Sequence, residues 1–181
     1  MASWRDERGF SLAELLVAFA VLALVLAAVT TIHQGALQAY VTGSNKTEVQ
    51  QNARVALERI ARELRQTPGA LTSATATSLT LLDQDTGAAV TYALTGEGFN
   101  ATLTRTTNGV SGVVIGRVQT PPSQFLYRDI NDNVLGSPVG TPANVFRVDI
   151  SIQSASEDTV VAGESADTRA ELTTSVRLRN L

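Results

Sequence analysis

Residues 8–32 read RGFSLAELLVAFAVLALVLAAVTTI, in which a charged edge is followed by a long apolar run. From Leu15 to Val29 this run contains no polar residue. A helix that crosses a membrane needs about 20 mostly apolar residues, and polar side chains are tolerated near its two ends. The sequence therefore predicts a transmembrane helix over residues 10–32.

The helical pattern continues beyond the apolar run, since no proline occurs before Pro68. Apolar residues then recur at spacings of three and four, which places them on one face of a helix: Val49, Ala53, Ala56, Leu57, Ile60 and Leu64. The opposite face carries three i,i+4 pairs of opposite charge: Arg54–Glu58, Glu58–Arg62 and Arg59–Glu63. We expect one helix over 10–66, whose continuation at 33–67 is amphipathic.

After Pro68 the pattern changes to the alternation of apolar and polar residues that is typical of half-buried strands. The predicted strands are 79–82, 90–94, 101–105, 113–118, 124–128, 146–152 and a last one near 171–179. Asp/Asn-rich segments at 83–87 and 129–133 predict turns. The fold class is therefore α+β, with the amphipathic helix covering an antiparallel sheet in the region 68–181. The polar stretch 154–168 is expected to be a solvated loop; the alternative is that its acids bind a partner.

Composition excludes several classes of function. The 181-residue chain has a formal net charge of −3, which argues against direct nucleic-acid binding. It has no cysteine and one histidine, so disulfides, thiolate zinc sites and cysteine nucleophiles are excluded. We find no nucleophile, base and orienting group in a recognisable pattern. The expectation is a non-enzyme without cofactor or metal.

Glu14 is the informative residue, because it lies inside the predicted span. A carboxylate in a membrane costs a few kcal/mol near the centre and less near the edge, so it needs a partner or a purpose. One alternative is that Glu14 only marks the interface. Another is an ordinary secretory signal, which is cleaved off after its apolar core. The charged residues before the run include acids, however, and the run continues into a helix that we expect the mature protein to retain.

Residues Gly9-Phe10-Ser11-Leu12-Ala13-Glu14 resemble the prepilin cleavage and methylation motif of type IV pilins and type II secretion pseudopilins. This resemblance implies that a prepilin peptidase removes a leader, residues 1–9, by cutting between Gly9 and Phe10. It also implies that the new amino terminus, Phe10, is N-methylated. Glu14 then pairs with the Phe10 amine of a neighbouring subunit during assembly, since an unpaired charge in an apolar bundle is costly.

Shorter phrases are similar to minor pilins of the PilW type and minor pseudopilins of the GspJ type. They are 53–65, the hairpin from 81–83 to 90–92, 103–105 and the ending 176–181. The chain also lacks the C-terminal cysteine pair of major pilins, and Thr31 stands where many of them carry a proline. The resemblance therefore implies a minor subunit of a pilus or secretion filament.

The same resemblance implies the partners and the location. The partners are other pilin or pseudopilin subunits, the prepilin peptidase and the inner membrane, which the chain crosses once with its globular region on the periplasmic side. The alternative function is a pilin-like tip subunit that binds DNA during competence or a surface ligand. Asp83, Asp85 and Gly87, or Asp129, Asn131 and Asn133, resemble fragments of a calcium loop, but neither is followed by the expected glutamate and both suit turns.

Overall fold

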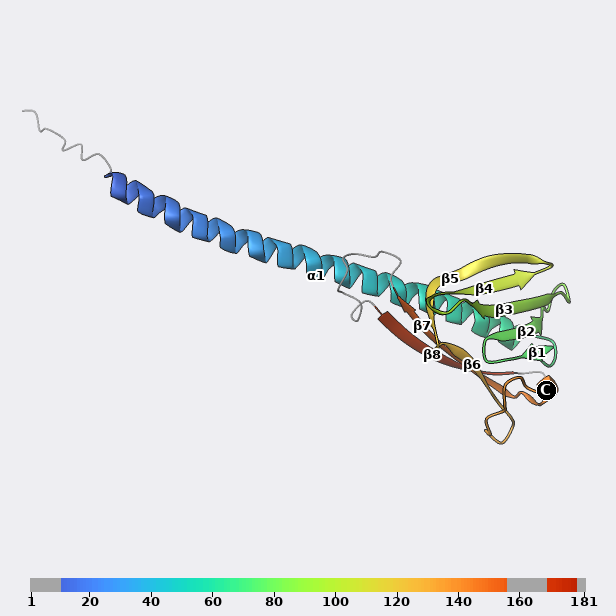
Figure 1. Ribbon diagram of the computed structural model, residues 1–181. Helices are drawn as coiled ribbons and strands as arrows, with labels where there is room; N and C mark the ends of the chain where they lie inside the picture. The colour runs from blue at the N-terminus through green and yellow to red at the C-terminus, as the bar shows by residue number, and fades with distance from the viewer. Residues whose placement is uncertain (1–10, 156–168, 179–181) are drawn as a thin grey trace, which may run out of the picture. The chain divides into compact units, whose positions relative to one another are not determined.

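The computed structural model describes residues 11–155 and 169–178, and Figure 1 shows its elements. One long helix, α1 (Leu12–Gln66), precedes all the strands. The strands are β1 (Ser73–Ala74), β2 (Ser78–Leu82), β3 (Ala89–Thr95), β4 (Gly98–Thr107), β5 (Val110–Thr120), β6 (Gln124–Arg128), β7 (Arg147–Ala155) and β8 (Arg169–Arg177). A short 3₁₀ helix, η1 (Pro142–Asn144), lies between β6 and β7. The architecture is α+β and pilin-like, as predicted.

The strands of the described residues form one antiparallel sheet in the order β1-β2-β3-β4-β5-β7-β6, with β8 paired to β7. β8 pairs with β7 along its whole length, from Arg147↔Arg177 to Ala155↔Arg169. The opposite edge of β7 is therefore shared by β6 and, through Val118↔Ser154, by β5. Among the described strands, β8 is therefore the last one on its side of β7.

Backbone hydrogen bonds link the two ends of the curled sheet, although β1 and β6 themselves do not pair. The amide of Phe125 in β6 donates to the carbonyl of Ala76 at 2.8 Å, and the amide of Val139 donates to the carbonyl of Ala74 at 2.9 Å. Irregular register between β4 and β5 contributes to the curl, since bulges bend a strand and increase its twist. Arg117 has a φ of 46° in this irregular part of β5.

The turn between β3 and β4 requires a glycine at position 96. Gly96 has a φ of 103°, which L-residues with a side chain rarely adopt. A Cβ at this position would lie 2.9 Å from the Cα of Ala101, closer than real Cβ contacts come. The tight approach of the two strands at this hairpin therefore depends on the missing side chain.

The apolar stripe of α1 packs on the sheet, as predicted from its spacing. All six predicted positions are buried, and Ala61 joins them. From Ala53 to Leu64 these buried residues form one core with residues of β2, β3, β4, β6 and β7, among which Tyr92, Leu103 and Ile150 are fully buried. Of the three predicted ion pairs along α1, two are present: Arg54–Glu58 at 3.5 Å and Arg59–Glu63 at 3.4 Å. The predicted Glu58–Arg62 pair was wrong, because the exposed Glu58 carboxylate lies against the other arginine four residues away, Arg54.

The predicted strands agree with the observed ones except in extent. β4, β5 and β7 are longer than predicted, and the two-residue β1 and η1 were missed because neither shows a periodic pattern. Residues 156–168, most of the predicted acidic loop, lie outside the described residues. Contacts divide the chain into two compact units, 1–42 and 43–181. The boundaries predicted at residues 9, 32 and 67 stay predictions.

Candidate processing and assembly segment

The start of α1 is closed by a reciprocal pair of hydrogen bonds between Ser11 and Glu14. The backbone amide of Ser11 donates to Oε2 of Glu14 at 2.9 Å. The backbone amide of Glu14 donates to Oγ of Ser11 at 3.2 Å. This arrangement is a capping box, which satisfies two of the amides that the first turn of a helix leaves without a partner.

Glu14 therefore has an intramolecular role that the motif resemblance did not reveal. Its carboxylate accepts a hydrogen bond from its own chain, so it has a polar partner even in an isolated molecule. The signal was present in the sequence: a serine followed three residues later by a glutamate, ahead of an apolar run, is the pattern of a capping box. A negative side chain in the first turn also suits the positive end of the helix dipole.

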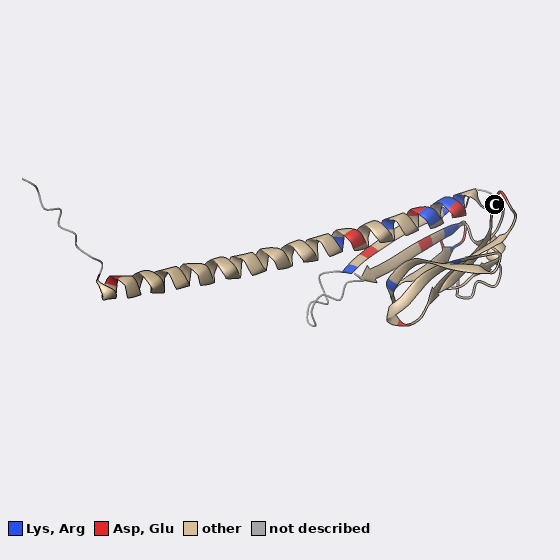
Figure 2. Cartoon of the chain, turned by 90° about the horizontal axis from the view of Figure 1, so that it is seen from above, with Lys and Arg blue, Asp and Glu red and all other residues tan. Residues whose placement is uncertain are grey.

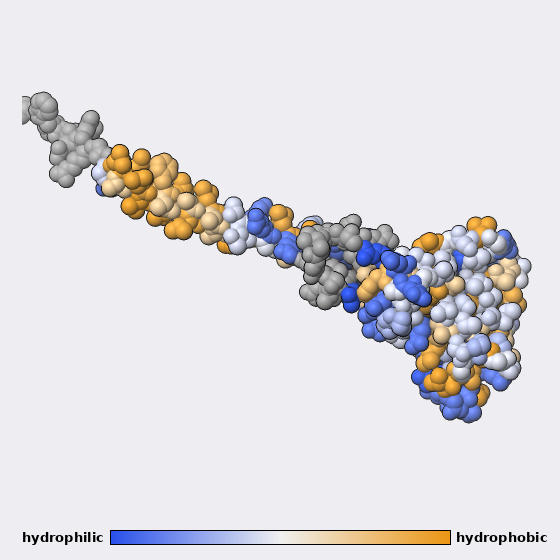
Figure 3. All heavy atoms as spheres, in the orientation of Figure 1, coloured by the Kyte–Doolittle hydropathy of each residue, from blue (hydrophilic) through white to orange (hydrophobic). Residues whose placement is uncertain are grey.

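The first part of α1 is apolar on all sides, and its side chains are exposed (Figure 3). Leu16, Phe19, Leu22, Leu24 and Val29 each expose more than half of their surface. Soluble proteins rarely leave so many large apolar side chains together in water. By length and composition this helix is a candidate to cross a membrane. The motif and the helix together fit a single-pass, membrane-anchored protein.

The other predicted site residues at this end cannot be placed. Gly9 and Phe10, the predicted cleavage and methylation residues, lie outside the described residues, as does the predicted leader 1–9. The structure therefore brings together only Ser11 and Glu14 from the predicted motif.

The two segments that resemble calcium loops, 83–87 and 129–133, form turns that are stabilised by hydrogen bonds to an aspartate side chain. Oδ1 of Asp83 accepts hydrogen bonds from the amides of Asp85 and Thr86 and from the Thr86 hydroxyl. Oδ1 of Asp129 accepts from the amides of Asn131 and Asn133. The hydrogen bonds from Thr86 lower the pKa of Asp83, and those from Asn133 lower the pKa of Asp129. Within the described residues, no group of three or more His, Cys, Asp or Glu side chains is arranged to hold a metal ion.

A half-buried ion pair ties α1 to the sheet. Nε of Arg105 in β4 lies 3.1 Å from Oε1 and 3.2 Å from Oε2 of Glu63 in α1. Burial lowers the pKa of Arg105, but the hydrogen bond and the charge of Glu63 outweigh burial and raise it. The neighbouring Tyr92 has its pKa raised by burial and by the negative charge of Glu63. Sequence reasoning missed this contact because 42 residues separate its partners.

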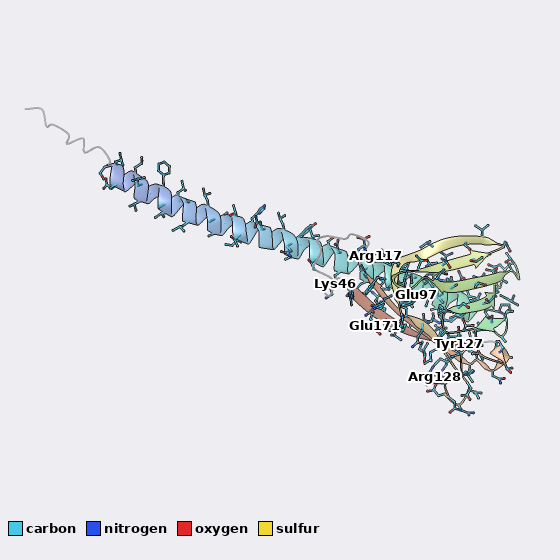
Figure 4. The ribbon with its side chains drawn as sticks, in the orientation of Figure 1. Lys46, Glu97, Arg117, Tyr127, Arg128 and Glu171 are labelled. Atoms are coloured by element: carbon cyan, nitrogen blue, oxygen red, sulfur yellow. The ribbon has the colours of Figure 1, made fainter. Side chains whose placement is uncertain are left out.

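A second polar cluster joins β6, β7 and the turn at 129–133. Nε of Arg128 lies 2.7 Å from Oδ2 of Asp149, and a terminal nitrogen of Arg147 lies 2.6 Å from Oδ1 of Asp132. Figure 4 labels Arg128 beside Tyr127, whose buried hydroxyl donates to the carbonyls of Thr75 and Ser78. These contacts connect parts of the sheet and support the fold.

Comparisons with known proteins place the recognisable signal at the amino-terminal end of the chain. Neither the comparison with curated proteins nor the comparison with solved structures found a match. Residues 4–30 match the family described as the prokaryotic N-terminal methylation motif. This family is structural and not catalytic, and its motif implies processing by a prepilin peptidase and assembly with other pilin subunits. The matched residues include the capping box and most of the apolar run, and they support a type IV pilin-like or pseudopilin-like processed subunit.

Proposed function

We propose that this chain is a minor pilin or pseudopilin, made as an inner-membrane precursor and later assembled into a pilus or secretion filament. The methylation motif at 4–30 supports this role most directly, because it leads without a break into a capped, apolar helix. In the membrane, the apolar side chains of this helix lose the contact with water that makes them costly in a soluble protein. The region from Gly43 onward would lie on the extracytoplasmic side.

Processing then creates the charge that assembly uses. Cleavage between Gly9 and Phe10 frees an amine, which carries a positive charge close in sequence to Glu14. In a bundle of apolar helices an uncompensated charge is costly. Pairing the N-methylated amine of one subunit with Glu14 of the next removes this cost and sets the axial step between subunits. In the uncut precursor the capping box keeps Glu14 hydrogen-bonded to Ser11.

The first experiment locates the mature amino terminus. The chain is expressed in a host that has a prepilin peptidase, purified from membranes and analysed by mass spectrometry. We expect N-methyl-Phe10 as the first residue, and we expect Gly9→Val to accumulate the uncut precursor. An amino terminus at Met1 or after Ala28 in the wild-type chain would show that the motif is not processed in this way.

The second experiment separates the cap from the charge. Glutamine can replace glutamate in a capping box, so Glu14→Gln keeps the cap and removes the charge. Ser11→Ala removes the serine half of the cap, which costs about 1 kcal/mol of helix stability, and keeps the charge. We expect Glu14→Gln and Glu14→Leu to reduce filament number and co-purification of other subunits. Ser11→Ala should assemble, and all three variants should still be cut.

The opposite ranking would contradict the proposed role of Glu14. If Ser11→Ala impaired assembly while Glu14→Gln assembled normally, Glu14 would serve only to cap its own helix. Normal processing of the variants provides the control that each one reaches the membrane and the peptidase.

A further inference from the structure

A groove of about 520 Å³ lies between the second half of α1 and β8. Its residues are Arg54, Leu57, Glu58, Ala61, Arg62, Arg65, Leu172, Thr173 and Thr174. Leu57 and Ala61 are buried and Leu172 is partly buried, so the groove has an apolar floor. The three arginines stand on the helix side; Figure 2 shows that basic residues alternate with acidic ones along this part of α1.

The groove is positive although the chain as a whole is acidic. Three arginines and one glutamate give its lining a formal charge of +2, whereas the chain has −3. Arg54 pairs with Glu58 at 3.5 Å. Arg62 and Arg65 are exposed and make no hydrogen bond, ion pair or ring contact with any residue that the structure describes.

Other arginines of the same region are engaged. Arg59 and Arg105 share Glu63, Arg169 lies over the ring of Phe99 and Arg177 over the ring of Phe146. The acid of β8, Glu171, does not line the groove and accepts from the Ser151 hydroxyl at 3.5 Å (Figure 4). Among the arginines of α1 and β8 that the structure describes, the two without a partner, Arg62 and Arg65, therefore both line the groove.

The strand side of the groove is an open sheet edge. Among the described strands, β8 pairs with β7 alone, so its other edge has no strand beside it. The outer edges of β1 and β6 are different, because each has a neighbouring segment bonded to it: the amide of Phe125 in β6 donates to Ala76, which follows β1, and Ala74 in β1 accepts from Val139, which follows β6. An open edge exposes backbone amides and carbonyls, and it is a template for pairing with another chain.

We propose that this groove binds an extended, acidic segment of another polypeptide, which adds a strand to β8. Strand addition supplies main-chain hydrogen bonds, while pockets for alternate side chains supply specificity. An apolar side chain of the segment packs on Leu57, Ala61 and Leu172, and carboxylates on the same face pair with the arginines. Arginine binds carboxylates with two parallel hydrogen bonds, which are among the stronger ones in proteins.

The dimensions agree with this mode of binding. Arg54 and Arg65 are eleven residues apart, which corresponds to about 16 Å along a helix. Side chains four residues apart on one face of a strand are separated by about 13 Å. Two carboxylates at that spacing, with an apolar residue midway between them, therefore span most of the distance from Arg54 at one end of the groove to Arg62 and Arg65 at the other.

Single-stranded nucleic acid is the other polyanion that an arginine-lined groove suggests. Its binding sites commonly stack bases on aromatic side chains. The groove contains none, since its apolar residues are leucine and alanine. This favours the acidic peptide.

The test uses the full-length protein in detergent micelles and the fluorescein-labelled peptide Thr-Glu-Thr-Val-Thr-Glu-Thr, measured by fluorescence anisotropy. We expect saturable binding that weakens as salt is added, and none for Thr-Lys-Thr-Val-Thr-Lys-Thr. Arg62→Gln with Arg65→Gln should weaken binding at least about tenfold, the loss expected when one charged hydrogen bond is removed. Methylating the backbone nitrogens of the peptide should also abolish binding if it adds as a strand.

The matched control removes two positive charges outside the groove, with Lys46→Gln and Arg59→Gln, and should change the affinity by less than about twofold. Equal binding of the lysine peptide, or of the acidic peptide to the Arg62 and Arg65 variant, would overturn the proposal. Equal binding of the N-methylated peptide would overturn strand addition. Tighter binding of an oligothymidine would make this a nucleic-acid site instead. Because both forms of the chain carry the groove, a failure of processing or assembly would leave these results unchanged.

Discussion

At the scale of single residues, ion pairs of this protein differ in what they contribute because they differ in exposure. The Arg54 and Glu58 side chains are 72% and 65% exposed, and such pairs contribute little to stability. Arg105 and Glu63 are 20% and 18% exposed, so removing Glu63 would leave the charge of Arg105 partly buried and without its ion-pair partner. The pair of Arg105 and Glu63 therefore helps to hold α1 on β4, whereas the exposed pair of Arg54 and Glu58 contributes little to stability.

Asp149 makes stability depend on pH. Burial raises the pKa of Asp149, but hydrogen bonds from Ser175 and Arg128, with the charges of Arg147 and Arg128, outweigh burial and hold it below its usual value. Because the folded pKa is lower than the unfolded one, the ionised carboxylate stabilises the fold above about pH 4, the unfolded pKa. This contribution is lost as the pH falls through the folded pKa.

We predict that Asp149→Asn destabilises the protein by about 1–3 kcal/mol at pH 7, since Arg128 loses a charged hydrogen bond and Arg147 loses an ion pair. The difference from wild type should shrink at pH 3, which thermal unfolding followed by circular dichroism would measure. Asp85→Asn, at an exposed turn position, should change stability by less than about 0.5 kcal/mol. A deficit that is equally large at both pH values would contradict the role of the ionised carboxylate.

At the scale of elements, α1 serves two environments. Its first part presents apolar side chains on all sides, and its second part buries one stripe against the sheet while charged residues occupy the rest. The same backbone geometry suits both, because a helix satisfies its own hydrogen bonds in lipid and in water alike. Only the distribution of side chains around the axis distinguishes the two parts.

Substitution of Leu57 tests whether the buried apolar stripe of α1 holds the helix on the sheet. It is 5% exposed within the core, so Leu57→Ala should reduce the free energy of unfolding by about 2–4 kcal/mol. Val55 lies two residues away and is 56% exposed, so Val55→Ala should cost less than about 0.5 kcal/mol. Chemical denaturation of both variants is the measurement. Equal losses would mean that the buried stripe does not hold the helix on the sheet.

At the scale of the whole molecule, the two compact units differ in what they need from their surroundings. Unit 43–181 contains the core and the sheet, while the other unit supplies exposed apolar helix. We predict that a fragment beginning at Gly43 is soluble, monomeric and cooperative in thermal unfolding, because its core includes no residue before Val49. Analytical ultracentrifugation and calorimetry would test this.

The full chain provides the comparison for the fragment. It should partition into membranes and stay there after washing with high salt, since apolar burial and not charge holds it. The fragment carrying Leu57→Asp should aggregate or unfold, because a charge would enter the core. A fragment that aggregates regardless of this substitution would show that the sheet needs a cover from outside residues 43–181.

The sequence by itself determined the helix, its two environments, the class of fold and the processing motif. Each of these follows from a pattern of neighbouring residues. An unbroken apolar run predicts the membrane part of the helix, and apolar residues three and four apart predict its amphipathic part. Alternating apolar and polar residues predict the strands, and the six residues from Gly9 to Glu14 form the processing motif. The capping box could also be predicted from the sequence, since Ser11 and Glu14 are three residues apart. These patterns involve residues that are close in sequence, so they can be recognised without knowledge of the tertiary contacts.

Only the tertiary structure decided which strand edges meet and which charges are paired. The two ends of the sheet are linked by backbone hydrogen bonds, and Glu63 meets Arg105, through contacts between residues that lie more than 40 positions apart. The same folding leaves Arg62 and Arg65 without partners among the described residues and places them beside the open edge of β8. Alternation shows that a strand has two faces, but it carries no information about which strand lies at an edge, because neighbours in a sheet are chosen by packing across the whole core.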